Sequence, residues 1–184
     1  MNRITPLFTP GDCPSDADPE TRREIGEFFA AMFPGNPAPA IDEPHTGLAL
    51  AAHSPVFAQK LSALTSSVVL ELGWSKRQDL MELAIQAVNL HFGCSFSFET
   101  RLGKADGTGI GLARIAALPM WRTSKLFDDE QRLVLEYVEA VVTGSVPDEL
   151  FARVKEKWGQ KGTVEFTAVI GTFSLWAMLI NATL

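Results

Sequence analysis

The chain has 184 residues, of which 46% are hydrophobic and 21% charged, and its formal net charge is −6. This size and composition are those of one globular domain with a full hydrophobic core, and they exclude a disordered chain. The negative charge and the absence of a basic run argue against a nucleic-acid partner.

Cysteine use and the terminal sequences set the expected location of the protein. The only cysteines are Cys13 and Cys94, which lie far apart in the chain. Two such cysteines do not make a disulfide framework, so we expect a reducing, cytoplasmic setting. Residues 1–10 lack the apolar stretch of a signal peptide. Residues 166–184 are uncharged, but polar side chains interrupt them, so we expect a buried or interface helix and no membrane span.

The first part of the chain, residues 1–45, is predicted to be an arm with one helix and a proline-rich linker. Asp18 followed by Pro19 is a typical helix start, and the helix is expected to run to about Phe33. Residues 36–44 contain three prolines and are expected to form the linker. The helical domain proper is then predicted to span residues 46–184.

Capping and stop residues divide this domain into successive helices. Ser75 and Gln78 have the spacing of a capping box, which predicts a helix that ends before Gly93. No segment shows the alternation typical of strands, so we predict an all-α protein of about eight helices. The other helices expected in this domain are 55–72, 94–106, 109–118, 128–142, 147–158 and 163–184.

Glu82 is the strongest candidate for a catalytic residue. It lies within a helix whose apolar side chains recur at helical spacing, and a buried charge is costly unless it is paired or takes part in chemistry. The functional interpretation is a general acid or base in an apolar environment. The alternative is a surface glutamate at the edge of the apolar stripe.

The stretch from Glu82 to Arg101 resembles the carboxymuconolactone decarboxylase and alkylhydroperoxidase D family. Redox members of that family have a glutamate, then eleven residues, a Cys-x-x-Cys pair, three residues and a histidine. Glu82 and Cys94 match this pattern, whereas Ser97 replaces the second cysteine and Arg101 replaces the histidine. The resemblance implies an alkylhydroperoxidase D-like helical bundle that forms oligomers, with Glu82 in a proton relay.

Cys94 and Ser97 allow two interpretations. Cys94 follows a glycine at an expected helix N-terminus, where a thiolate would be favoured, but a free cysteine is also commonly a small buried hydrophobe. Ser97 cannot form a disulfide, which excludes a dithiol cycle, although its hydroxyl can donate a hydrogen bond to Cys94.

Arg101 and His91 are the remaining candidates for ligand binding. Arginine cannot act as a base, so Arg101 is expected either to bind a carboxylate or to form an ion pair with Glu82. His91 lies three residues before Cys94 and could replace the missing histidine, unless it is simply exposed or satisfied elsewhere.

Three functions remain open from the sequence. The first is an enzyme that acts on a small organic acid, in which Arg101 holds the carboxylate and Glu82 moves protons. The second is a peroxiredoxin-like antioxidant that uses Cys94 alone. The third is a catalytically silent oligomeric protein that binds a small molecule.

Neither a metal nor an organic cofactor is expected. His45 and His53 lack neighbouring metal ligands, and residues 107–112 do not form a dinucleotide-binding glycine motif. A homo-oligomer is expected, whether a dimer, trimer or hexamer, because residues 166–184 and the stripe of the arm helix offer more apolar surface than one small domain can cover. That stripe consists of Ile25, Phe28, Phe29 and Met32.

Overall fold

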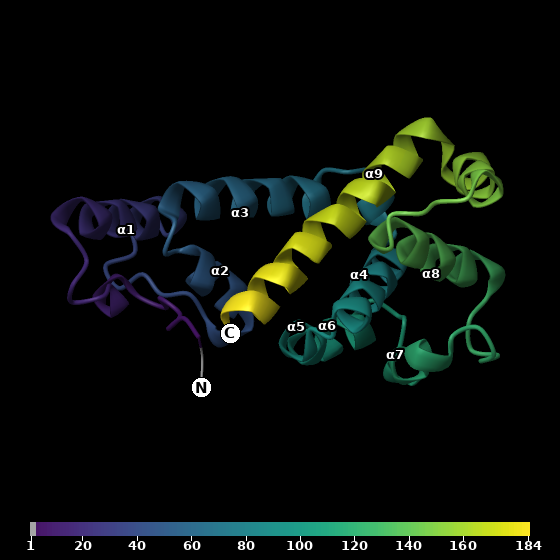
Figure 1. Cartoon of the computed structure of the whole chain (residues 1–184), viewed down its shortest axis with the longest axis horizontal. Helices are drawn as coiled ribbons and strands as arrows, with labels where there is room; N and C mark the ends of the chain where they lie inside the picture. Colours follow the sequence, from purple (N-terminus) through teal and green to yellow (C-terminus); the bar gives the residue numbers. More distant parts are fainter. Residues whose placement is uncertain (1–2) are drawn as a thin grey trace. The chain divides into compact units, whose positions relative to one another are not determined.

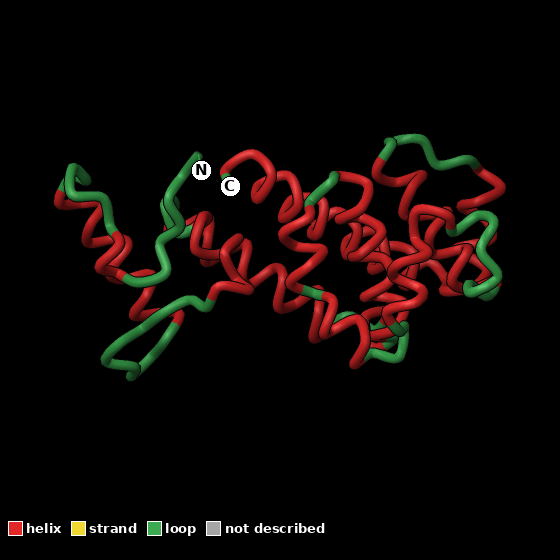
Figure 2. The backbone as a smooth tube through the Cα atoms, turned by 90° about the horizontal axis from the view of Figure 1, so that it is seen from below, coloured by secondary structure: helices red, strands yellow, loops and turns green. Residues whose placement is uncertain are grey.

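The computed structural model describes residues 3–184, and in this range the chain forms nine α-helices, four short 3-10 helices and no strand (Figures 1 and 2). The all-α prediction is therefore confirmed. The helices are α1 Pro19–Met32, α2 Thr46–Ala51, α3 Pro55–Leu70, α4 Gln78–Phe92, α5 Ser95–Thr100, α6 Leu102–Gly107, α7 Leu112–Ala117, α8 Asp129–Val142 and α9 Asp148–Thr183.

The chain divides into two compact units. One unit reaches from the N-terminal residues to Thr65 and includes Leu179–Leu184, and the other comprises Ser66–Met178. The predicted boundary at residue 46 between an arm and a helical domain stays a prediction. All candidate site residues lie in the second unit.

In the first unit, α1 begins as the sequence predicts. The Asp18 carboxylate accepts a hydrogen bond from the backbone N–H of Thr21 at 2.9 Å, which caps the helix. Ile25, Phe28 and Phe29 are buried, at most 1% exposed. The expectation that this apolar stripe is left uncovered is wrong, so the arm helix no longer argues for an oligomer.

The start of α4 differs from the prediction of a capping box at Ser75. Trp74–Lys76 forms a 3-10 turn, and the hydroxyl of Ser75 donates a 2.6 Å hydrogen bond to the carbonyl of Val68 at the end of α3. The hydroxyl is used by the preceding helix, and α4 begins only at Gln78. The helix ends as predicted, because Gly93 adopts the left-handed conformation with a φ of 62°.

The predicted helix over residues 94–106 is also wrong, because the chain forms two short helices there. The break falls at Arg101, whose φ of −97° and ψ of −2° depart from regular helix geometry. In Figure 1, α5 and α6 lie near the end of α4, and α8 runs beside α4. The break therefore puts Arg101 next to the helix that carries Glu82.

α8 and α9 follow the sequence more closely. Asp128 and Gln131 form the capping box of α8. Gly159, with a φ of 69° and a ψ of 178°, interrupts α9 and separates the two predicted helical segments. By length and composition alone α9 is apolar enough to cross a membrane, but 56% of its apolar window is buried, and a core helix passes the same test.

Candidate functional site

A row of buried polar side chains runs along α4. Glu82, Gln86 and Asn89 are 0%, 0% and 1% exposed, although apolar side chains occupy most of this helix. Their spacing of four and three residues places them on one face of the helix. Glu82 is thus a buried residue and not a surface glutamate at the edge of the apolar stripe.

Arg101 forms a bidentate ion pair with Glu82. Its Nε donates to Oε1 of Glu82 at 3.0 Å, and its Nη2 donates to Oε2 at 2.5 Å. The side chain of Arg101 remains 19% exposed, whereas that of Glu82 is sealed from solvent. The guanidinium also lies over the ring of Phe173 in α9, with 5.1 Å between its Cζ and the ring centroid. Of the two interpretations of Arg101, the ion pair is the one present here.

Lys104 is a third charged residue at this site. It follows Arg101 by three residues, and among the described residues no ion pair involves it. Lys104 is an exposed residue, but partial desolvation of its ammonium group and the charge of Arg101 lower its pKa, and Glu82 partly opposes this shift. The cluster therefore holds two cations and one carboxylate. Sequence reasoning missed Lys104, although its helical spacing from Arg101 was a usable signal.

Gln86 and Asn89 attach the polar row to α5. The side-chain amide of Gln86 donates a 3.2 Å hydrogen bond to the carbonyl of Phe98, and that of Asn89 donates to Gln86 at 3.4 Å. Oδ1 of Asn89 is buried, and no residue in the described range 3–184 forms a hydrogen bond with it. These contacts fix the end of α5, just before Arg101, against α4. The sequence signal was polar residues at helical spacing from Glu82.

Cys94 is a buried thiol. It is 1% exposed, and its backbone N–H donates a 2.8 Å hydrogen bond to the carbonyl of Asn89. Burial raises the pKa of the thiol, and a hydrogen bond from the backbone of Ser97 offsets this only in part. Of the two interpretations of Cys94, the structure favours the small buried residue, because desolvation raises the pKa of the thiol by more than the backbone of Ser97 lowers it. The hydrogen bond from Ser97 to the sulfur of Cys94 comes from the backbone N–H and not from the hydroxyl group.

His91 lies away from the charged cluster. It follows Glu82 by nine residues, which places it on the opposite face of α4. It is exposed, packs edge-on against Phe92 and lines a shallow hollow of about 170 Å³ with Trp121 and Glu139. His91 therefore does not replace the missing histidine beside Glu82.

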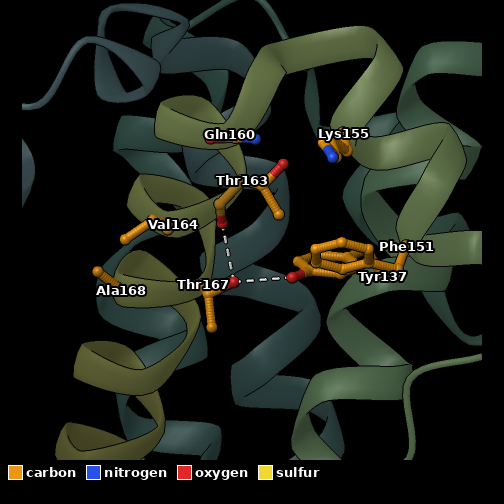
Figure 3. Close-up of a pocket in the computed structure, with 8 residues that line it drawn as sticks. All are labelled: Tyr137, Phe151, Lys155, Gln160, Thr163, Val164, Thr167 and Ala168. Atoms are coloured by element: carbon orange, nitrogen blue, oxygen red, sulfur yellow. Dashed lines mark hydrogen bonds between the residues drawn. The ribbon is translucent and has the colours of Figure 1, made fainter. Parts of the chain in front are cut away.

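Other features of the described residues bear on ligands. No group of three or more His, Cys, Asp or Glu side chains within residues 3–184 could hold a metal ion. A larger hollow of about 500 Å³ lies between α8 and the two segments of α9 (Figure 3). Neither hollow is lined by Glu82 or Arg101, so the expectation that these two residues face one cavity stays a prediction.

Comparison with known proteins finds two uncharacterized relatives. The chain is 37% identical to the uncharacterized protein YnjA of Escherichia coli over 92 residues, which are 48% of this chain and 50% of YnjA. It is 24% identical to the uncharacterized protein YdfG of Bacillus subtilis over 102 residues, which are 54% of this chain and 67% of YdfG. The aligned part thus spans about half the length of YnjA. No model of a protein family matches the chain.

Proposed function

We propose that this chain is a divergent, non-redox relative of the carboxymuconolactone decarboxylase and alkylhydroperoxidase D family that binds a small organic acid. The acid's carboxylate lies against Arg101 and Lys104, and Glu82 transfers protons. The spacing of Glu82 and Cys94 supports the family likeness and the alkylhydroperoxidase D-like form of the bundle. The buried carboxylate of Glu82, with the partly exposed Arg101 and the exposed Lys104 beside it, supports the binding of an acid.

The charge imbalance at the cluster carries this proposal. Arg101 and Lys104 place two positive charges near the single carboxylate of Glu82, and this carboxylate is sealed from solvent whereas Lys104 is exposed. Glu82 takes two of the five N–H donors of Arg101, and the side chain of Arg101 is still 19% exposed. A ligand carboxylate could therefore occupy the free edge of Arg101 and also contact Lys104.

Binding of an acid gives Glu82 a chemical role. A second carboxylate beside Arg101 competes with Glu82 for the N–H donors of the guanidinium. A Glu82 carboxylate released from the ion pair in this way can exchange a proton with a carbon atom of the bound ligand. This chemistry fits proton transfer next to a carboxylate or the protonation that follows loss of carbon dioxide.

The other candidate functions receive less support. A peroxidase that uses Cys94 alone requires an accessible thiolate, but this thiol is buried and burial raises its pKa. A catalytically silent binding protein would use the same cluster and differs from the enzyme only in the lack of turnover.

Calorimetric titration with small acids tests the proposal. Levulinate, succinate and cis,cis-muconate serve as probes, and methyl levulinate is the neutral control. We expect an acid to bind and the ester not to bind. Lys104→Met should weaken the binding of the acid by about five-fold. Lys125→Met, at an exposed lysine outside the cluster, should leave its affinity unchanged.

Two results would contradict the proposal. One is that none of the acids binds, and the other is that Lys104→Met and Lys125→Met have the same effect. Arg101→Lys adds a separate check, because lysine cannot replace the two-pronged geometry of arginine. NMR analysis of the mixture for released products then separates an enzyme from a silent binding protein.

A further inference from the structure

The hollow between α8 and α9 is a second place where a small molecule could bind. Its volume of about 500 Å³ is within the range of small-molecule sites. Its walls come from three segments of the second unit: α8, the part of α9 before Gly159 and the part after it. Residues that line it include Tyr137, Phe151, Lys155, Gln160, Val164 and Thr167.

The interior of this hollow is apolar and its hydroxyl groups are already satisfied. Tyr137 and Thr167 are joined at 2.8 Å between their hydroxyl oxygens, and the Thr167 hydroxyl donates a 2.8 Å hydrogen bond to the carbonyl of Thr163 (Figure 3). Thr167 therefore accepts from Tyr137. Phe151 and Val164, which both line the hollow, are 44% and 69% exposed despite their apolar side chains. This interior suits the apolar body of a ligand.

One end of the hollow has a positive charge that forms no ion pair with any residue the structure describes. Residues 148–161 contain four basic side chains, and Lys155 is the one for which the described residues provide no ion pair. Figure 3 shows Lys155 and Gln160 at the same end, beyond the aromatic rings. The three paired residues are Arg153 with Glu136, Lys157 with Glu130 and Lys161 with Glu165.

We propose that this hollow binds an amphipathic carboxylic acid with an alkyl chain or an aromatic ring. Its carboxylate meets Lys155 and the side-chain amide of Gln160, and its apolar body lies along Tyr137, Phe151 and Val164. The site shares no residue with the Glu82–Arg101 cluster and takes a larger, more apolar ligand. It therefore goes beyond the proposed function and does not depend on it.

The test uses decanoate as the probe and decan-1-ol as its uncharged counterpart. Binding to the full chain is followed by the amide NMR signals of residues around the hollow and by calorimetry. Lys155→Met should weaken the binding of decanoate by about five-fold and leave the affinity for decan-1-ol unchanged, because only the acid contacts the ammonium group. Lys161→Met, on the same helix but outside the hollow, is the matched control and should change neither affinity.

A second pair of variants tests the apolar body. Ala168→Phe fills the hollow and should abolish binding of both probes. Val164→Asp, at an exposed position that tolerates a charge, should weaken the binding of decanoate more than that of decan-1-ol. It also provides a test if Ala168→Phe fails to fold.

The proposal is overturned if Lys155→Met and Lys161→Met affect decanoate equally, or if decanoate binds both Ala168→Phe and Val164→Asp like the wild type. It is also overturned if light scattering shows that Val164→Asp dissociates an oligomer while decanoate binds neither form, because a second copy of the chain then covers the hollow. Binding of levulinate at Arg101 is measured separately, so failure here does not decide the proposed function.

Discussion

The guanidinium of Arg101 donates two hydrogen bonds, of 3.0 Å and 2.5 Å, to the carboxylate of Glu82, although the two residues are nineteen positions apart in the chain. The carboxylate is fully buried, whereas the side chain of Arg101 is 19% exposed. This pair joins α4 to the junction of α5 and α6, and it is the centre of the proposed site. Its loss should therefore affect both stability and ligand binding.

Arg101→Met should reduce the free energy of unfolding by about 3 kcal/mol or more, because it leaves a buried carboxylate without its counter-charge. Arg153→Met is the matched control, since its ion pair with Glu136 is exposed and should contribute about 1 kcal/mol or less. The double variant Glu82→Leu with Arg101→Met should regain most of the loss. Urea unfolding measures all three, and equal losses for the two arginine variants would contradict the account.

Cys94 should react slowly with iodoacetamide in the folded protein at pH 8. Burial raises the pKa of its thiol above the ordinary value of 9.0, so the thiol stays protonated until the pH rises through the raised value. The stability that this shift contributes is complete below pH 9 and is lost at higher pH. A Cys13→Ser variant isolates the signal, and urea should accelerate the reaction. Rapid alkylation of the folded protein at pH 7 would show that Cys94 is a reactive thiol after all.

Ser97→Cys should introduce a disulfide that the wild type lacks. Peroxide oxidises the thiol introduced at position 97, which is less buried than Cys94, to a sulfenic acid. The Cys94 thiol then attacks this sulfur, forms the disulfide and releases water. Mass spectrometry after mild peroxide should show a loss of two mass units in this variant, with or without Arg101→His, and not in the wild type. Peroxide turnover in the wild type that survives Cys94→Ala would place the chemistry elsewhere.

Gly159→Ala should destabilise the protein by about 1 kcal/mol or more, because its φ of 69° is unfavourable for residues with a Cβ atom. Gly171 lies within the same helix, has no positive φ and leaves free space where the Cβ atom of an alanine would lie. Gly171→Ala should therefore stabilise by about 0.5 kcal/mol or more. Thermal unfolding compares the two, and the same sign for both substitutions would argue against the break at Gly159.

The sequence predicts those features that depend on local chemistry. The caps at Asp18 and Asp128 and the stops at Gly93 and Gly159 act within a few residues, and the structure contains all four. Ser75 has the residues of a capping box, but the end of α3 competes for its hydroxyl, and such competition depends on tertiary contacts.

The same difference between local chemistry and tertiary contacts explains why the sequence predicts only part of the site. Glu82 and Arg101 came from a spacing pattern, and their pairing was one of two alternatives. Lys104, Gln86 and Asn89 were missed because their importance follows from which helices meet, and not from any one stretch. Whether Cys94 is a thiolate depends on the balance between burial and helix amides, which a sequence alone does not reveal.

The most direct test of the central claim is whether a small acid binds beside Arg101. Calorimetric titration with levulinate measures the Kd for the wild type and for Arg101→Lys. The account predicts that levulinate binds the wild type and binds Arg101→Lys about ten-fold more weakly, because lysine cannot replace the bidentate geometry of arginine. Absence of binding to the wild type, or an affinity that is unchanged in Arg101→Lys, would contradict it.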